Sequence, residues 1–206
     1  MKTKLSSLAT LTLCLFFLAS GAFAGSIPVN NYSFENHPAF NSGDTTGQWT
    51  QGLAIPDWTI TGSGGVWMPS NLNPPATDGS VLAWSNGGSF FQSVTTTSAG
   101  LTYTLQVDVL HRNDAPMLSI EQLTFNGVPV ATATGVNAGP GTWNLFTATY
   151  TAGGAGTLGI LLTASGAQGD WDNVRLSVPE PTTPATLLGF GIFNLAAVFG
   201  VRRKLA

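Results

Sequence analysis

The chain has 206 residues and a formal net charge of −3 at pH 7, and only 8% of its residues are charged. Between Gly25 and Ser177 there are no lysines, two arginines and nine carboxylates, a net charge of −7. This argues against a nucleic-acid partner, because phosphate binding needs a basic surface. The one cysteine, Cys14, precedes this stretch, which excludes disulfides, cysteine zinc sites and thiol catalysis within it.

The first 24 residues have the pattern of a Sec signal peptide. Lys2 and Lys4 precede an apolar run from Leu8 to Leu18, and Ala22-Phe23-Ala24 supplies an A-x-A cleavage site before Gly25. We therefore expect a signal helix over residues 1–24, export through the Sec translocon, and cleavage between Ala24 and Gly25. An uncleaved signal anchor is the alternative.

Short alternating apolar runs separated by turn residues follow, and helical periodicity is nearly absent up to residue 177. This pattern predicts one all-β domain over residues 25–177, a two-sheet antiparallel jelly-roll sandwich of about nine strands. In its first half we expect a long loop from Asn36 to Ala54, a turn at Asn86-Gly87-Gly88, and five strands. The strands are Ile27–Glu35, Ile55–Thr61, Gly65–Met68, Ser80–Trp84 and Ser89–Val94.

In the second half the clearest strand is Leu101–His111, in which Tyr103, Leu105 and Val107 share one face. A change of parity predicts a bulge or a strand break near Glu121-Gln122. Asn126-Gly127 predicts a type I′ hairpin. Alternating apolar residues predict three further strands, around residues 146–150, 158–162 and 174–178.

The last 29 residues combine a proline-rich break, an apolar run and a basic end. No charge occurs from Ala185 to Val201, a length at the short end of what spans a bilayer, and Arg202, Arg203 and Lys204 follow. We expect a transmembrane helix over 185–201 that holds the precursor in the inner membrane.

The order of Val178-Pro179-Glu180-Pro181, a spanning segment and Arg202-Arg203-Lys204 resembles the PEP-CTERM sorting signal over residues 178–206. The resemblance implies recognition by exosortase and transfer to the cell surface or extracellular matrix of a Gram-negative, exopolysaccharide-producing bacterium. An ordinary C-terminal anchor with a proline-rich stalk is the alternative.

Five short motifs resemble, in order, the landmarks of galactose-binding-like jelly rolls, a fold shared by many carbohydrate-binding modules. They are Asn31–Glu35, Pro56–Thr59, Asp78–Ser80, Gly141–Trp143 and Trp171–Leu176. The resemblance implies a structural Ca²⁺ with Glu35 and Asp172 as ligands, since Ca²⁺ prefers oxygen ligands. Alternatively, Glu35 caps a loop and Asp172 accepts turn N–H groups.

A sugar site needs exposed aromatic side chains beside amide and acid groups. Trp67 and Trp84 are the candidates, together with Trp49, and their possible polar partners are Asn71, Asn86 and Asp114. The alternative is that these tryptophans belong to the core, which we expect for Trp58, Trp143 and Trp171.

We find no pattern of catalytic residues. The two histidines, His37 and His111, stand in no recognisable Ser/His/Asp arrangement, and no paired glutamates suggest glycoside hydrolysis. His111-Arg112 ends a predicted strand, and we interpret it as a solvated loop edge. We therefore expect a non-catalytic exported protein with a structural or adhesive role in exopolysaccharide or biofilm, for which polysaccharide is the candidate partner. The alternatives are a carbohydrate-binding module with a defined glycan site and a secreted hydrolase.

Overall fold

The computed structural model describes residues 24–71 and 73–179, which form one compact unit. Most of the predicted signal helix, the predicted membrane helix over 185–201 and the rest of the tail from Glu180 lie outside the described residues. Within 24–71 and 73–179, no helix is long and apolar enough to cross a membrane.

The described chain is all-β and antiparallel, as predicted, with eleven strands where about nine were expected. The strands are β1 (Ala24–Ile27), β2 (Ser42–Asp44), β3 (Gly47–Trp49), β4 (Thr59–Pro69), β5 (Leu82–Thr96), β6 (Thr102–His111), β7 (Ser119–Phe125), β8 (Val128–Thr132), β9 (Thr142–Thr151), β10 (Thr157–Ala164) and β11 (Gln168–Pro179).

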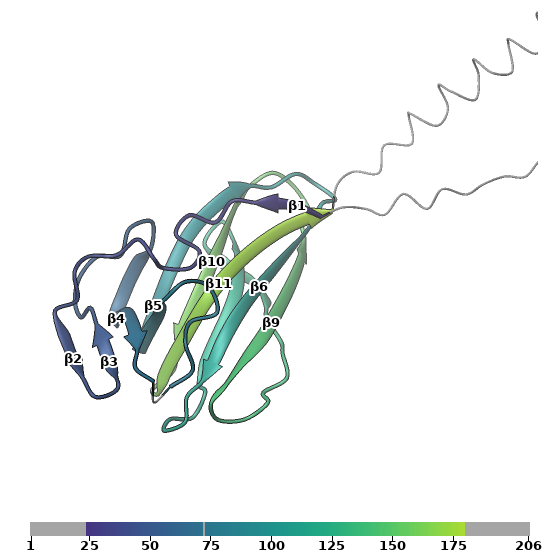
Figure 1. The fold of residues 1–206 in the computed structure, drawn as a ribbon. Helices are drawn as coiled ribbons and strands as arrows, with labels where there is room; N and C mark the ends of the chain where they lie inside the picture. The colour runs from purple at the N-terminus through teal and green to yellow at the C-terminus, as the bar shows by residue number, and fades with distance from the viewer. Residues whose placement is uncertain (1–23, 72, 180–206) are drawn as a thin grey trace, which may run out of the picture. The chain divides into compact units, whose positions relative to one another are not determined.

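The strands form a two-layer jelly-roll sandwich (Figure 1). One layer has the order β2-β3-β4-β5-β10-β7-β8, and the other has the order β1-β11-β6-β9. Strand β11 belongs to both: its first residues pair with β5, as in Asp170 opposite Trp84, and its later residues pair with β6. At this end of the domain the strand ladder therefore continues from β3 to β9 across the two layers.

The core lies between the layers and follows from the two-residue period of the strands. On β6, Tyr103, Leu105, Val107 and Val109 are buried, as predicted. They share the core with the alternating leucines and isoleucine of β10 and with a cluster of aromatic rings. Ring centroids lie 5.9 Å apart for Phe34–Phe90 and 6.0 Å apart for Phe90–Trp171.

A second apolar cluster lies on the opposite face of the continuous ladder. Val66 and Ala83 face the core, so their strand neighbours Trp67, Leu82 and Trp84 face away from it. Trp49 and Trp143 are half-buried against this outer cluster. The prediction that Trp143 belongs to the core is therefore wrong; its Nε1 donates to the carbonyl of Pro75 at 2.8 Å.

The predicted first strand, Ile27–Glu35, is wrong beyond Ile27. Residues 30–33 form turns, and Asn31 and Phe34 have φ values of 48° and 61°. The Asn31 side chain closes this loop, because its Oδ1 accepts the N–H of Asn36 at 3.0 Å and its Nδ2 donates to the carbonyl of Asn36 at 2.9 Å. Hydrogen bonds from the Asn31 side chain thus hold this segment as a loop, where the sequence pattern predicted a strand.

The predicted loop Asn36–Ala54 contains the β2–β3 hairpin. Its turn is held by Asp44, whose Oδ1 accepts the N–H and the hydroxyl of Thr46 at 2.7 and 2.6 Å. Three-residue strands are too short to show a two-residue period, which is why the sequence pattern gave no signal.

The turn predicted at Asn86-Gly87-Gly88 is also wrong, since β5 passes straight through it. Asn86 pairs with Ser63 of β4 on one side and with Gln168 of β11 on the other, and from Ser89 onward β10 replaces β11 as the second neighbour. A register shift between Thr61 and Ser63 of β4 accommodates the irregular residues.

The bulge predicted near Glu121-Gln122 does not form between β7 and β10, whose register is unbroken, but the pairing of β7 with β8 shifts register between Leu123 and Thr124. The change of parity arises because Glu121 occupies a core-facing position. It is 1% exposed, its Oε1 accepts the indole N–H of Trp171 at 2.8 Å, and burial raises its pKa. The Asn126-Gly127 hairpin is confirmed, with φ values of 51° and 80°.

Candidate functional site

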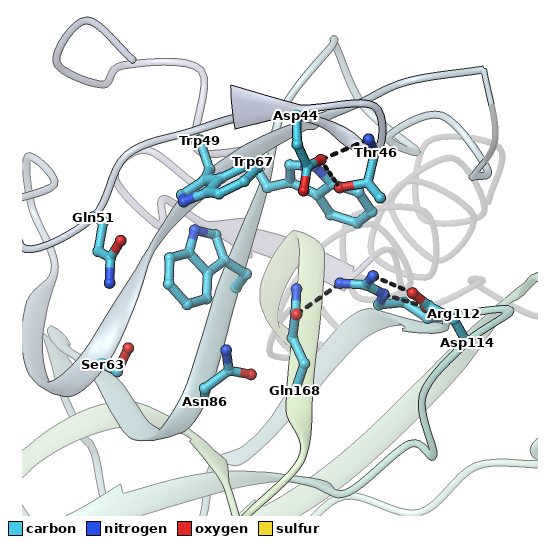
Figure 2. A pocket seen from close by; sticks show the side chains of 11 residues that line it. Asp44, Thr46, Trp49, Gln51, Ser63, Trp67, Asn86, Arg112, Asp114 and Gln168 are labelled. Carbon is cyan, nitrogen blue, oxygen red and sulfur yellow. Dashed lines mark hydrogen bonds and ion pairs between the residues drawn. The ribbon is translucent and has the colours of Figure 1, made fainter. Parts of the chain in front are cut away.

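A cavity of about 440 Å³ opens on the outer face of the domain (Figure 2). Strands β3 to β5, the turn of the β2–β3 hairpin, the chain after β6 and the start of β11 supply its walls. Its lining residues are Asp44, Thr46, Trp49, Gln51, Ser63, Trp67, Trp84, Asn86, Arg112, Asp114 and Gln168.

The three tryptophans that the sequence analysis singled out line this one cavity. Trp49 pairs with Trp67 across β3 and β4, and Trp84 lies on the neighbouring strand β5. Trp67 and Trp84 are only 3% and 6% exposed, whereas Trp49 is half-buried. Of the predicted polar partners, Asn86 and Asp114 also line the cavity, but Asn71 is exposed and does not.

One wall of the cavity is a hydrogen-bonded network around Arg112. Its Nε and Nη2 donate to the two carboxylate oxygens of Asp114 at 2.8 and 2.7 Å, and its Nη1 donates to Oε1 of Gln168 at 2.7 Å (Figure 2). The guanidinium also lies 4.9 Å from the ring centroid of Trp67, within cation–π range. The Arg112 side chain is 12% exposed, so the interpretation of His111-Arg112 as a solvated loop edge is wrong for Arg112.

Beneath this wall lies a buried carboxylate, Asp170, which the sequence analysis did not assign to this site. Asp170 has no exposed surface, and its Oδ1 accepts the amide N–H of Gln168 at 2.7 Å. Its Oδ2 is buried without a hydrogen-bond partner among the described residues. Burial raises the pKa of Asp170 to about 7. Its position opposite Trp84 was not predictable, because the sequence does not show that β11 passes between β5 and β6.

Glu35 and Asp172, the predicted calcium ligands, both bind the segment Thr77–Val81. Oδ2 of Asp172 accepts the N–H groups of Thr77 and Asp78 at 2.7 and 2.8 Å, and the Thr77 hydroxyl at 2.9 Å. Oε1 of Glu35 accepts the N–H groups of Ser80 and Val81 at 2.7 and 2.8 Å.

This geometry matches the alternative in which the two carboxylates accept loop N–H groups. The loop N–H groups donate to Oδ2 of Asp172 and to Oε1 of Glu35. The other carboxylate oxygens, Oδ1 of Asp172 and Oε2 of Glu35, each accept one hydrogen bond, at 2.7 and 3.2 Å. Across the residues that the structure describes, no group of three or more His, Cys, Asp or Glu side chains is placed to hold a metal. Calcium therefore stays a prediction.

The predicted processing residues fall at the edge of the described chain. Val178 and Pro179 belong to β11, where they pair with Gly25 and Ala24 of β1. The predicted signal-peptide cleavage site before Gly25 and the start of the predicted sorting motif at Val178 thus lie on neighbouring strands. Ala22, Glu180, Pro181, Arg202, Arg203 and Lys204 lie outside the described residues.

A comparison with family models decides the family. The model described as "HpiC1-like: HpiC1 cyclase" matches residues 25–177. The chain belongs to the HpiC1-like family. The match covers the predicted domain and ends before the tail. A comparison with curated proteins gives no match.

Solved structures with a similar fold include carbohydrate-binding modules. The CBM22-1–GH10 modules of a Clostridium thermocellum xylanase complexed with xylohexaose share 15% identity over 62% of this chain and 27% of theirs, with a TM-score of 0.44. The tailspike protein 4 domain of bacteriophage CBA120 shares 14% over 74% of this chain and 21% of its own, with a TM-score of 0.46. The CBM22-1 xylan-binding domain of Paenibacillus barcinonensis Xyn10C shares 14% over 73% and 94%, with a TM-score of 0.42.

This chain spans about a quarter of the first of these structures and a fifth of the second. All three TM-scores are below 0.5, so these similarities carry no argument about what the HpiC1-like domain binds. That argument rests on the cavity.

Proposed function

We propose that the HpiC1-like domain is a non-catalytic glycan-binding domain, and that its ligand lies in the cavity lined by Trp49, Trp67 and Trp84. The observation that carries the proposal is the convergence of three indoles from three neighbouring strands in one cavity. Its volume of about 440 Å³ lies within the range of roughly 300–1,000 Å³ typical of ligand sites.

The chemistry of the walls suits a sugar. Sugar rings have apolar faces that pack against aromatic rings, while their hydroxyls need hydrogen-bond donors and acceptors. The indoles supply apolar surface, and the carboxylates and amides around them supply polar groups. The proposal predicts that immobilised polysaccharide retains the domain from Gly25 to Pro179, and retention should be lost when a soluble oligosaccharide of the same sugar competes. No retention on any glycan would contradict it.

A cyclase is the second candidate, because the family description names one. In favour of catalysis, Asp170 is a buried carboxyl group whose pKa of about 7 would let it hold a proton near neutral pH. Against it, Asp170 has no exposed surface and does not line the cavity. Direct proton transfer to a ligand would require Gln168 or Trp84 to move.

The two candidates differ in the ligand they need. A cyclase cavity should bind small apolar molecules, so naphthalene would raise the melting temperature of the domain and sugars would not. We expect the reverse. In addition, Asp170→Asn should leave glycan binding unchanged, whereas a cyclase that depends on this acid would lose its activity.

We further propose that the tail delivers this domain: Sec exports the precursor, the segment 185–201 holds it in the inner membrane, and exosortase recognises Val178–Pro181. We expect Glu180→Ala or Pro181→Ala to leave the protein in the inner-membrane fraction, while wild type reaches the cell surface or medium. Fractionation followed by immunoblotting distinguishes these results. Unaltered release of both variants would mean that the tail is a plain anchor.

A structural Ca²⁺ remains part of the proposal. If present, it would be held by Oδ1 of Asp172 and Oε2 of Glu35, the oxygens with one donor each. In that case a chelator such as EDTA lowers the melting temperature of the domain and added Ca²⁺ restores it. An identical transition with and without EDTA would rule calcium out.

A further inference from the structure

From the cavity's hydrogen bonds and charges, we infer that its ligand is an uncharged glycan, whose hydroxyl groups are recognised by the indole N–H of Trp84 and by the side chains of Gln51, Ser63 and Asn86. In this inference Arg112 is a positioning residue and not a receptor for an anionic sugar. The inference rests on the proposed glycan-binding function and names the class of ligand.

Arg112 is the one cationic side chain among the described lining residues, and Asp114 already balances its charge. Both oxygens of Asp114 accept from Arg112, and the remaining Nη1 contact goes to Gln168. The guanidinium also covers the face of Trp67 at 4.9 Å. The hydrogen bonds to Asp114 and Gln168 use three of the five guanidinium N–H donors, and Asp114 balances the charge of Arg112. A carboxylate or sulfate on a sugar would therefore gain little from this arginine, and Arg112 instead fixes the orientation of the indole.

The fixed charges of the cavity repel anions. Asp44 is ionised at neutral pH because its hydrogen bonds from Thr46 lower its pKa, and Arg112 lowers the pKa of Asp114 in the same way. Two carboxylates therefore face one guanidinium in the lining, within a domain of net charge −7. Like charges placed close together oppose binding, so a uronic-acid polymer meets a repulsive site.

The opposite wall offers unpaired polar groups. Figure 2 shows Gln51 and Ser63 on the side of the cavity away from Arg112, and Asn86 between Ser63 and Gln168, its partner on β11. Among the described residues, no hydrogen bond from a protein group engages these three side chains. They are exposed and thus free to donate to and accept from sugar hydroxyls.

Trp84 supplies the strongest sign of a missing polar partner. It is 6% exposed and lines the cavity, and its Nε1 is buried without an acceptor in the described part of the chain. A buried donor without a partner costs about 1–3 kcal/mol, and buried tryptophan N–H groups normally have acceptors. A ligand hydroxyl, which accepts as well as donates, would satisfy it in the complex once the indole turns toward the cavity, because Nε1 itself is buried in the free domain.

Isothermal titration calorimetry on the domain from Gly25 to Pro179 tests the inference with two sets of hexasaccharides. The neutral set contains hexamers of glucose, xylose, mannose and galactose, and the anionic set contains hexamers of galacturonate and guluronate. We expect at least one neutral hexamer to bind tenfold or more tightly than either anionic hexamer. Asp44→Asn should reduce this difference in affinity between neutral and anionic hexamers, because it removes a negative charge from the cavity.

Two variants test the polar groups that we assign to recognition of the sugar hydroxyls. Asn86→Ala should weaken binding of the neutral hexamer by about fivefold or more, and Trp84→Phe, which keeps an aromatic ring but removes the N–H, by a similar factor. Asn71→Ala is the matched control, since Asn71 is an exposed amide outside the cavity, and it should bind like wild type.

The outcomes separate the two levels of the proposal. Tighter binding of an anionic hexamer that Trp49→Ala abolishes would overturn this inference and leave the glycan-binding function standing. An Asn86→Ala variant with wild-type affinity would overturn the assignment of the wall. Binding of neither set would overturn both the inference and the proposed function.

Discussion

The Asp170→Asn variant is expected to melt at a higher temperature than the wild-type domain at pH 8, and at nearly the same temperature near pH 4. Asp170 is fully buried, and its Oδ2 has no partner among the described residues. Ionisation therefore costs free energy in the folded state that it does not cost in the unfolded chain. An asparagine side chain has no charge to bury, and its Oδ1 can still accept the N–H of Gln168.

The direction follows from the two pKa values. Burial raises the pKa of Asp170 from its ordinary value of 3.8 to about 7, so between these values the folded protein binds a proton that the unfolded chain does not. The stability contributed by this proton is complete below pH 3.8 and is lost as pH rises to about 7. The full difference between the two pKa values corresponds to about 4 kcal/mol. For a domain of this size, that is about 8–16 °C in melting temperature.

Melting curves of both proteins from pH 4 to pH 8, followed by circular dichroism, measure this difference. Asp172→Asn is the control on the same strand: burial raises the pKa of Asp172 to about 6, but its Oδ2 accepts three hydrogen bonds. That variant should melt below wild type at pH 8, because it weakens those bonds. Parallel curves for wild type and Asp170→Asn would show that Asp170 does not titrate in this range.

Gly79→Ala is expected to lower the free energy of unfolding by about 3 kcal/mol or more. Gly79 has a φ of 82°, and a methyl group there would overlap the Glu35 carboxylate. The substitution therefore strains the backbone and also pushes Glu35 away from the N–H groups of Ser80 and Val81. Those bonds join the loop after β1 to the loop before β5, so their loss destabilises both loops.

Gly100→Ala separates the two contributions. Its φ of 79° is nearly the same, but a methyl group there would meet nothing within 4 Å. It should lose only about 1 kcal/mol, the conformational cost alone. Urea unfolding of the two variants gives both values. Equal losses would mean that Glu35 adapts to the methyl group and does not hold the segment Thr77–Val81 rigidly.

The sequence predicted the strands in which buried and exposed residues alternate without interruption, and the turn whose residue types its backbone requires. Strand β6 alternates for its whole length, and the Asn126-Gly127 turn has the residues that its backbone requires. The three cavity tryptophans were found because the other three, Trp58, Trp143 and Trp171, stand in motifs that the sequence analysis assigned to the core. Their convergence followed from the pairing of β3, β4 and β5, which no local pattern shows.

The elements that sequence reasoning missed depend on contacts between distant residues. Glu121 faces the core because Trp171, fifty residues later, supplies its hydrogen bond, so the polar residue was misread as a break. Arg112 was taken for a solvated residue, since nothing local shows that Trp67 and Gln168 surround it. Asp170 becomes unusual only when β11 pairs with β5 and β6 at once.

The affinity of the domain for the neutral hexasaccharide that wild type binds best, measured before and after Trp49→Ala, tests the central claim most directly. Trp49 and Trp143 are both half-buried against the outer cluster, but only Trp49 lines the cavity. The account predicts that Trp49→Ala weakens binding tenfold or more, or about 1.4 kcal/mol, while Trp143→Ala leaves it unchanged. Equal affinity of Trp49→Ala and wild type would contradict the assignment of the cavity as the glycan site.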